Sequence, residues 1–446
     1  MTTESQYKIK EIVLTSERWG AREFDISKAV VELNIYEDIE KPYLTGNLLY
    51  VDNLQFKSFA GITGTERVKI TIVKLDNTSL VKRFIISSVQ KEVSANERTD
   101  VRALQLVEEH AFLSSLKKFS KAYRGYPSFI ISSILSGHLN KSVDMRKVGH
   151  EQEIKVVIPY RTPLDAVEWI RDNMATATGC PYFLHASLMS DNLQLTTLEN
   201  LIGQRAWNDK IPYTYGLASH SATGQAEPGK VVHKEMFNIE RVSSVKIENT
   251  LQLAMSGAVG VEMNTLDVTL GRHSHSGHIN SKNTVSQILE KKVSSFKRGE
   301  SSTLNYYSDM EIGVDNLHYK KLHDYPSKVF SRVTADVYDD VNSYSYERDD
   351  ANRYQLPLKA AQLRRVIMNN VYNVQVPGPP FLLVDGAGVG GSVMINYALN
   401  TIDSTQNKKV DPERSGKFVT YRTRHQFVEE RHTVTMSVVK MTRTSS

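Results

Sequence analysis

Apolar and polar positions alternate over much of the first hundred residues of the chain. Within residues 30–75, two alternating runs flank a tight segment that begins at Pro42 and ends at Gly46. Successive side chains of a strand point to opposite faces, so this period of two, interrupted by Pro and Gly, predicts strand, turn and strand. Further strands are expected at 66–72, 84–89 and 101–107, with turns at 62–65 and 94–100. Residues 10–110 are therefore predicted to be almost entirely β-structure.

From Ala111 the spacing of apolar residues changes to that of helices mixed with short strands. A helix is expected at 127–135, and Thr162, Pro163 and Asp165 form a helix start: a cap, a first-turn proline and a carboxylate near the positive end of the dipole. The remaining elements of this part are a buried helical stripe (Leu164, Val167, Ile170, Met174), a strand at 154–158 and a hairpin of 182–185 with 193–196, turning at 190–192.

The second half of the chain is predicted to contain short strands separated by polar segments. Residues 216–235 are rich in Gly, Ser and Ala and are interpreted as a connector, and residues 302–355 are polar and rich in Tyr. The expected elements are strands at 242–248, 265–270 and 372–376, a helix-like piece at 251–259, a helix containing Leu363, Val366 and Ile367, and a terminal hairpin of 418–425 with 433–440. No self-similarity at a fixed period is visible along the chain.

Composition limits the class of protein. A chain of 446 residues predicts about two to four domains, and 40% apolar with 24% charged residues is ordinary for a globular protein. The 21 tyrosines favour β-structure, and one cysteine, Cys180, excludes an intrachain disulfide. The N-terminus lacks an apolar signal region and no run of about 18 apolar residues occurs, so folding in a cytoplasm is expected. A net charge of +5 does not indicate a dedicated nucleic-acid binder.

Two motifs have the spacing of ligand sites. Residues 386–391 match G-x-G-x-x-G, but the following residues 392–397 are β-prone where a dinucleotide site needs a helix, so we interpret the motif as a glycine-rich turn. His273, His275 and His278 could surround a metal, especially if several copies met, but no Cys or carboxylate lies within five residues of them. A surface loop is the favoured interpretation of these histidines.

Other candidates for chemistry are weaker. The segment 117–126 interleaves four basic residues with aromatic ones, as in a single-strand stacking platform, but a linker whose rings pack on a neighbouring domain is favoured. Cys180 with His185 could form a thiol nucleophile, although Cys180 enters an apolar strand where a buried inert thiol is usual. Glu429, Glu430 and His432 are too close in sequence to face one substrate atom. We therefore predict no enzyme activity, no cofactor, and no catalytic, cofactor-binding or metal residues.

Four patches of sequence follow one another along the chain. They are 43–46 with Asp52 and 64–66; 162–170 with 182–183 and 195–198; 374–378 with 388–390; and 415–419 with 425–427 and 432–436. In this order and spacing they resemble the central baseplate hub protein of contractile-tailed bacteriophages, which is related to the base of type VI secretion spike proteins. The chain lacks the C-terminal repeat or β-helix of the fused spike proteins, which favours a separate hub.

This resemblance implies a β-rich α+β, multidomain fold with two tail-tube-like β-barrel domains and smaller α/β domains. Three chains would form a pseudo-sixfold trimeric ring, in which the turn 42–46 and the strand 432–440 are architectural. The implied divisions are 1–110 (first barrel), 111–235 (α+β domain with connector), 236–300 with 372–446 (second, discontinuous barrel) and 301–371 (inserted Tyr-rich and helical domain).

The resemblance also implies a function and partners. The ring would adapt a hexameric tail tube to a trimeric cell-puncturing spike in the virion baseplate, assembled in the host cytoplasm. Its partners would be itself as a homotrimer, the spike, the tube ring, the baseplate wedge proteins, and genomic DNA passing through the lumen without specific binding, with no membrane. The alternatives are a tail-associated cell-wall hydrolase, which would need two converging carboxylates, and a secreted metal-binding adhesin.

Overall fold

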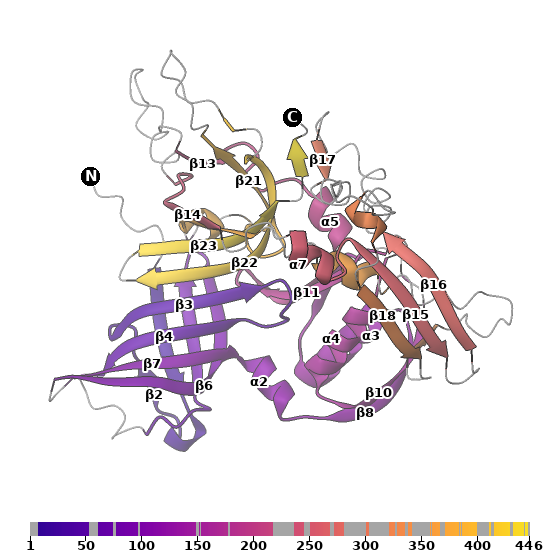
Figure 1. The fold of residues 1–446 in the computed structure, drawn as a ribbon. Coiled ribbons are helices and arrows are strands. Elements are labelled where there is room, and N and C mark those ends of the chain that lie inside the picture. Colours follow the sequence, from indigo (N-terminus) through magenta and orange to yellow (C-terminus); the bar gives the residue numbers. More distant parts are fainter. Residues whose placement is uncertain are drawn as a thin grey trace, which may run out of the picture.

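The computed structural model contains one large mixed sheet, with helices and small sheets at one end of it (Figure 1). The architecture is mostly β, as predicted for a β-rich α+β chain. The structure describes residues 8–52, 61–74, 77–96, 99–148, 151, 153–176, 179–216, 236–244, 250–267, 272–280, 300–302, 321–325, 328–334, 338–340, 357, 359–365, 371–382, 384, 386–398, 410–411, 414–428, 431–440 and 442–444.

The first part of the chain forms one antiparallel sheet unit, called here the first unit. Its strands lie in the order β1-β5-β6-β7-β4-β3, with β2 (Glu23–Asp25) beyond β1. The strands are β1 (Lys8–Thr15), β3 (Val30–Asp38), β4 (Thr45–Asp52), β5 (Arg67–Val73), β6 (Ser79–Asn96) and β7 (Thr99–Glu108). Alternating burial along β4 confirms the period of two that predicted these strands. The expected strands 84–89 and 101–107 are parts of the longer β6 and β7, so the turn is shorter than expected.

The second unit uses strands from the other end of the chain. Its order is β13-β21-β22-β23-β20-β14, and all neighbours are antiparallel except the pair β13 and β21. The strands are β13 (Tyr213–Tyr215), β14 (Arg241–Ser244), β20 (Val371–Pro377), β21 (Ser392–Tyr397), β22 (Gly416–Val428) and β23 (Arg431–Lys440). Numbered along the chain from one to six, both units have the strand order 1-4-5-6-3-2. With β2 set aside, the units therefore share their strand order, although the first strand is antiparallel to the fourth in the first unit and parallel to it in the second. No repeat is visible in the sequence.

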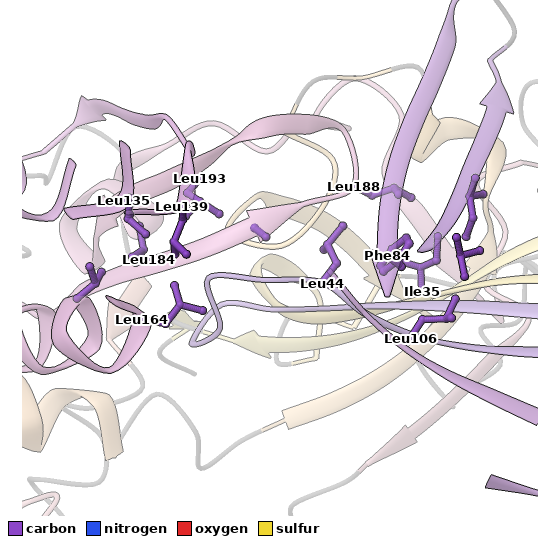
Figure 2. Packing of buried hydrophobic residues seen from close by; sticks show 14 of the residues in the cluster. Ile35, Leu44, Phe84, Leu106, Leu135, Leu139, Leu164, Leu184, Leu188 and Leu193 are labelled. Atoms are coloured by element: carbon purple, nitrogen blue, oxygen red, sulfur yellow. The ribbon is translucent and has the colours of Figure 1, made fainter. Parts of the chain in front are cut away.

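The region between the units packs its helices against the first unit. One core runs from Ile35, Phe84 and Leu106 of the sheet into helices α3 and α4 (Figure 2), with Leu44 lying between them. The elements are α2 (Glu109–Ser115), β8 (Phe119–Gly125), α3 (Pro127–Leu139), β9 (Val143–Lys147), β10 (Ile154–Arg161), α4 (Pro163–Asn173), β11 (Tyr182–Ser187), β12 (Ser190–Thr197) and α5 (Leu198–Gly203).

The predicted helix start at Thr162 is confirmed. The Thr162 hydroxyl accepts a hydrogen bond from the Asp165 amide at 3.3 Å, and Pro163 occupies the first turn of α4. The predicted turn of the next hairpin is wrong: Ser187 pairs with Ser190, so the chain turns at Leu188 and Met189 and not at 190–192. The turn falls there because Leu188 is fully buried while residues 191 and 192 are exposed.

The remaining described elements form small sheets beside the helices. β15 (Gly260–Asp267) pairs with β16 (Arg272–Asn280) and with β18 (Lys328–Thr334), outside the large sheet. The other elements are α7 (Thr250–Met255), β17 (Glu300–Ser302), β19 (Tyr338–Asp340) and β24 (Thr442–Thr444). Residues 359–365 are helical, as expected around Leu363, while Val366 and Ile367 lie outside the described residues. No helix among the described residues is long and apolar enough to span a membrane.

Candidate functional site: the seam between the two sheet units

The two units are joined by the pairing of β3 with β22, which we call the seam. The strands run antiparallel from Glu32 opposite Val428 to Asp38 opposite Arg422. Figure 1 shows the two strands side by side where the first unit meets the second. The seam makes the units one sheet of thirteen strands, because hydrogen bonds continue across it without interruption.

One face of the seam is a polar ladder. Glu32 accepts hydrogen bonds from the Asn34 amide at 2.8 Å, the Gln426 amide at 2.8 Å and the Arg424 guanidinium at 3.2 Å. Arg424 also donates to Asn34 at 2.9 Å. These cross-strand contacts fix the register of the pairing, since a slip of one residue would turn the ladder toward the core.

The opposite face of the seam buries a carboxylate. Glu37 is 1% exposed and lies directly across from Thr423. Its oxygens accept hydrogen bonds from the Thr423 hydroxyl, from the Leu188 amide in the β11–β12 turn, and from the Val389 amide at 3.2 Å. These donors come from three segments that are far from β3 in sequence. Glu37 therefore ties β3 to the second unit, to the β11–β12 hairpin and to the glycine-rich turn.

Two buried histidines extend this polar cluster. The His425 imidazole lies 3.6 Å from the Glu37 carboxylate, and His425 Nδ1 lies 3.3 Å from His432 Nε2. Burial alone would raise the pKa of Glu37, but His425, the Leu188 amide and the Thr423 hydroxyl lower that pKa to about 2. Burial, reinforced by His425, holds the pKa of His432 well below its ordinary 6.5. Glu37 is thus charged and His432 neutral at physiological pH.

The glycine-rich motif at 386–391 belongs to this cluster. It forms the turn before β21, which confirms the turn interpretation, and a strand follows it. A Cβ on Gly388 would lie 2.9 Å from Glu37 Oε2, and one on Gly390, which has φ +75°, would lie 2.6 Å from His185 Nε2. The glycines are needed because the backbone must approach two buried side chains closely.

A second buried carboxylate anchors the turn between β3 and β4. Glu108 accepts a hydrogen bond from the Leu44 amide at 3.0 Å and pairs with Lys141 at 2.8 Å, while a His110 ring nitrogen lies 2.8 Å from the Pro42 carbonyl oxygen. Burial would raise the pKa of Glu108, but His110 and Lys141 lower it to about 2. Gly46 at the end of the turn is required because a Cβ there would lie 2.8 Å from the Asn34 carbonyl oxygen.

The other sequence candidates, except His432, lie apart from the seam or outside the described residues. The histidine motif falls on strand β16, which pairs with β15. The prediction that these histidines lie on a loop is therefore wrong. Segment 117–126 contains strand β8 and not a linker; Phe119 stacks on His138 at 4.3 Å. Cys180 is fully buried, with its amide bound to the Thr176 hydroxyl. His432 belongs to the buried cluster, whereas Glu429 and Glu430 lie outside the described residues.

Sequence reasoning missed Glu37, Thr423 and His425. Glu37 sits in an alternating run at a position of the apolar set, two residues after Ile35, and this was the available signal that it faces the core. Its donors are 151, 352 and 386 residues away along the chain, so no local pattern could reveal them.

Comparison with known proteins supports the fold. No family model and no curated protein sequence matches the chain. A tail protein from Neisseria meningitidis MC58 is similar to it in structure, with TM-score 0.50, 11% identity and coverage of 97% of this chain and 96% of that chain. The 43 kDa tail protein of prophage MuSo2 from Shewanella oneidensis has TM-score 0.51, 11% identity and coverage of 97% and 98%. The chain thus has, over nearly its whole length, the fold of these tail proteins, which confirms the resemblance at the level of fold.

Replacing Glu37 by Gln should destabilise the protein strongly. The amide would present N–H groups to backbone N–H donors at a position that is only 1% exposed, so we expect a loss of about 3–5 kcal/mol in the free energy of unfolding. Urea denaturation followed by tryptophan fluorescence measures this loss. Glu32→Gln, on the solvent side of the same strand, is the matched control and should cost less than about 1 kcal/mol. Equal losses for both variants would contradict the role assigned to Glu37.

Acid should destabilise the protein in two steps. Below pH 6.5 the unfolded chain binds a proton that buried His432 excludes, so stability falls by up to about 1.4 kcal/mol per pH unit. The contribution of Glu37, whose folded pKa is lowered from 4.5 to about 2, is complete above pH 4.5 and is lost below it. Thermal melts of His432→Gln should show a smaller loss between pH 7 and pH 5 than the parent protein. Parallel curves would show that His432 does not cause the first step.

Proposed function

We propose that this chain is a structural baseplate hub of a phage tail, a homotrimeric ring that adapts a hexameric tail tube to a trimeric cell-puncturing spike. The observation that carries the proposal is the shared strand order of the two sheet units, joined by the seam. Each chain supplies two related units, so three chains supply six and can match a sixfold tube at one face. The assembly itself keeps threefold symmetry, which suits a trimeric spike.

The two units are the best candidates for the tube-like β-barrel domains. We place the first in 1–110 and the second in 236–300 with 372–446, to which β14 and β20–β23 belong. The second unit also takes β13 (Tyr213–Tyr215) from the segment 111–235. The rest of 111–235 is the α+β domain with its connector, and 301–371 is the inserted domain. The other proposed partners are the tube ring, the baseplate wedge proteins, and genomic DNA that passes through the channel without specific binding. The proposed location is the virion tail baseplate, after assembly in the host cytoplasm.

A structural role fits the chemistry of the seam better than a hydrolase role does. The two carboxylates with strongly lowered pKa values, Glu37 and Glu108, are both buried and accept hydrogen bonds from backbone amides. A cell-wall hydrolase needs two carboxyl groups facing one sugar in an open cleft. Both carboxylates instead hold segments of the fold together.

The mass in solution tests the proposed ring. Sedimentation equilibrium or native mass spectrometry should give three copies of the 50.4 kDa chain, about 151 kDa, and negative-stain images should show a ring with a central channel. Glu23→Gln, at an exposed position of β2 outside the seam, serves as a control that surface changes do not alter the mass. A dimer, a tetramer, or a monomer at every concentration would overturn the trimeric hub.

A further inference from the structure

The two sheet units match residue by residue around their fifth strands. In the first unit, the Thr65 amide donates to the Ile86 carbonyl at 2.8 Å, and the Ile86 amide donates to the Glu66 carbonyl at 2.9 Å. In the second unit, the Gly390 amide donates to the Thr420 carbonyl at 3.0 Å, and the Thr420 amide donates to the Gly391 carbonyl at 2.9 Å. Thr65 and Gly390 also share a positive φ, +78° and +75°. Ile86 of β6 is therefore the counterpart of Thr420 of β22.

Both fifth strands bulge immediately after these residues. The pairing of β6 with β7 shifts between Ile86 and Ser88, and that of β22 with β23 shifts between Thr420 and Arg422. The pairing of β6 with β7 shifts twice more, between Val89 and Lys91 and between Ser94 and Asn96, where β22 with β23 shows no shift, so positions on β6 are matched to β22 through β7. Before the bulge, each strand pairs on its other side with the fourth strand of its unit, β5 or β21. After the bulge the two strands differ in what lies on that side.

The edge of β22 after the bulge is occupied, whereas the same edge of β6 is open. Residues 422–428 of β22 pair with β3, the second strand of the first unit. Residues 87–96 of β6 have no strand on that side within the described part of the chain. The counterpart of β3 is β14, the second strand of the second unit, and it lies at the other end of the sheet with β20 as its only strand neighbour among described residues. The described residues thus include two complementary strand edges with no strand paired to them.

We propose that β14 of one copy pairs with β6 of the next copy, so that the contact between chains repeats the seam within the chain. This inference rests on the proposed trimeric ring and gives it an interface. Three seams within chains and three between chains would alternate around six units. An exposed strand edge is a template for such addition, and a head-to-tail contact of this kind closes when its rotation is 120°.

The register of the new pairing follows from the seam. Counting across the sheet from the counterparts Ile86 and Thr420 leads to Gly46 in the first unit and to Tyr372 in the second, so these two residues correspond. Ile35 lies opposite Gly46 and Ser244 lies opposite Tyr372, and so Ser243 corresponds to Asn34. Asn34 pairs with Gln426, which lies opposite Thr433. The counterpart of Thr433 in the first unit is Val101, and its partner on β6 is Val93. Ser243 of one copy is therefore expected opposite Val93 of the next, antiparallel.

Disulfide cross-linking tests this register. Directly opposite residues of antiparallel strands lie within the Cα separation of about 4.4–6.8 Å that a disulfide needs. Oxidised Ser243→Cys/Val93→Cys protein should run as a covalent trimer on non-reducing gels and return to a monomer after reduction. Asn34→Cys/Gln426→Cys, the matched pair at the seam, should cross-link within one chain and remain a monomer. Ser243→Cys/Ser87→Cys, displaced by six residues or roughly 20 Å along β6, should not cross-link.

The outcomes separate this inference from the proposed function. A particle of trimeric mass in which the Ser243→Cys/Val93→Cys pair fails to cross-link would overturn the strand pairing and leave the trimeric hub standing. Cross-linked ladders that continue beyond three copies would support the pairing and overturn the closed ring. A monomeric protein in which the Ser243→Cys/Val93→Cys pair does not cross-link would overturn both the strand pairing and the trimeric hub.

Discussion

The structure depends on how the edge of β22 beyond its bulge is covered. A strand edge exposes unpaired amides and carbonyls, and in this chain β3 covers them from more than 380 residues away in sequence. Placing β3 there brings Glu37 into the core, where a carboxylate is tolerated only with donors on both oxygens. The Leu188 and Val389 amides and the Thr423 hydroxyl supply them. The sheet cannot form correctly at this point unless all four segments are in place.

The buried carboxylates make the turn after β3 a fixed point of the fold. Glu37 lies just before this turn, and Glu108 holds the amide of Leu44 just after it. Between them, the Lys41 carbonyl accepts the Ala186 amide and the Glu40 carbonyl accepts the Arg171 guanidinium. The turn therefore joins the sheet to β11 and to α4, and this joint explains why one hydrophobic core continues from the first unit into the helices.

Local features could be predicted from the sequence because their causes are local. The alternation in β4 and the Thr162 cap require only neighbouring residues. The three polar residues 190–192 resemble a turn, but the β11–β12 hairpin turns at Leu188 and Met189, where Leu188 is fully buried and its amide donates to Glu37. The glycine-rich turn was recognised, but its reason, the close approach to Glu37 and His185, depends on residues distant in sequence.

The similarity of the two sheet units could not be predicted from the sequence, because it consists of strand order and backbone hydrogen bonds and not of shared residue types. The counterparts Thr65 and Gly390, and Ile86 and Thr420, make the same backbone hydrogen bonds but share no residue type. Thr65 and Gly390 also share a left-handed φ. Strand order and bulge position are fixed by backbone pairing, and many side chains satisfy either. A unit whose strand order is kept while its side chains differ can occur twice in one chain, with a different strand edge paired in each copy. The first unit pairs β3 with its neighbour within the chain, whereas β14 of the second unit has a strand on one edge only among the residues that the structure describes.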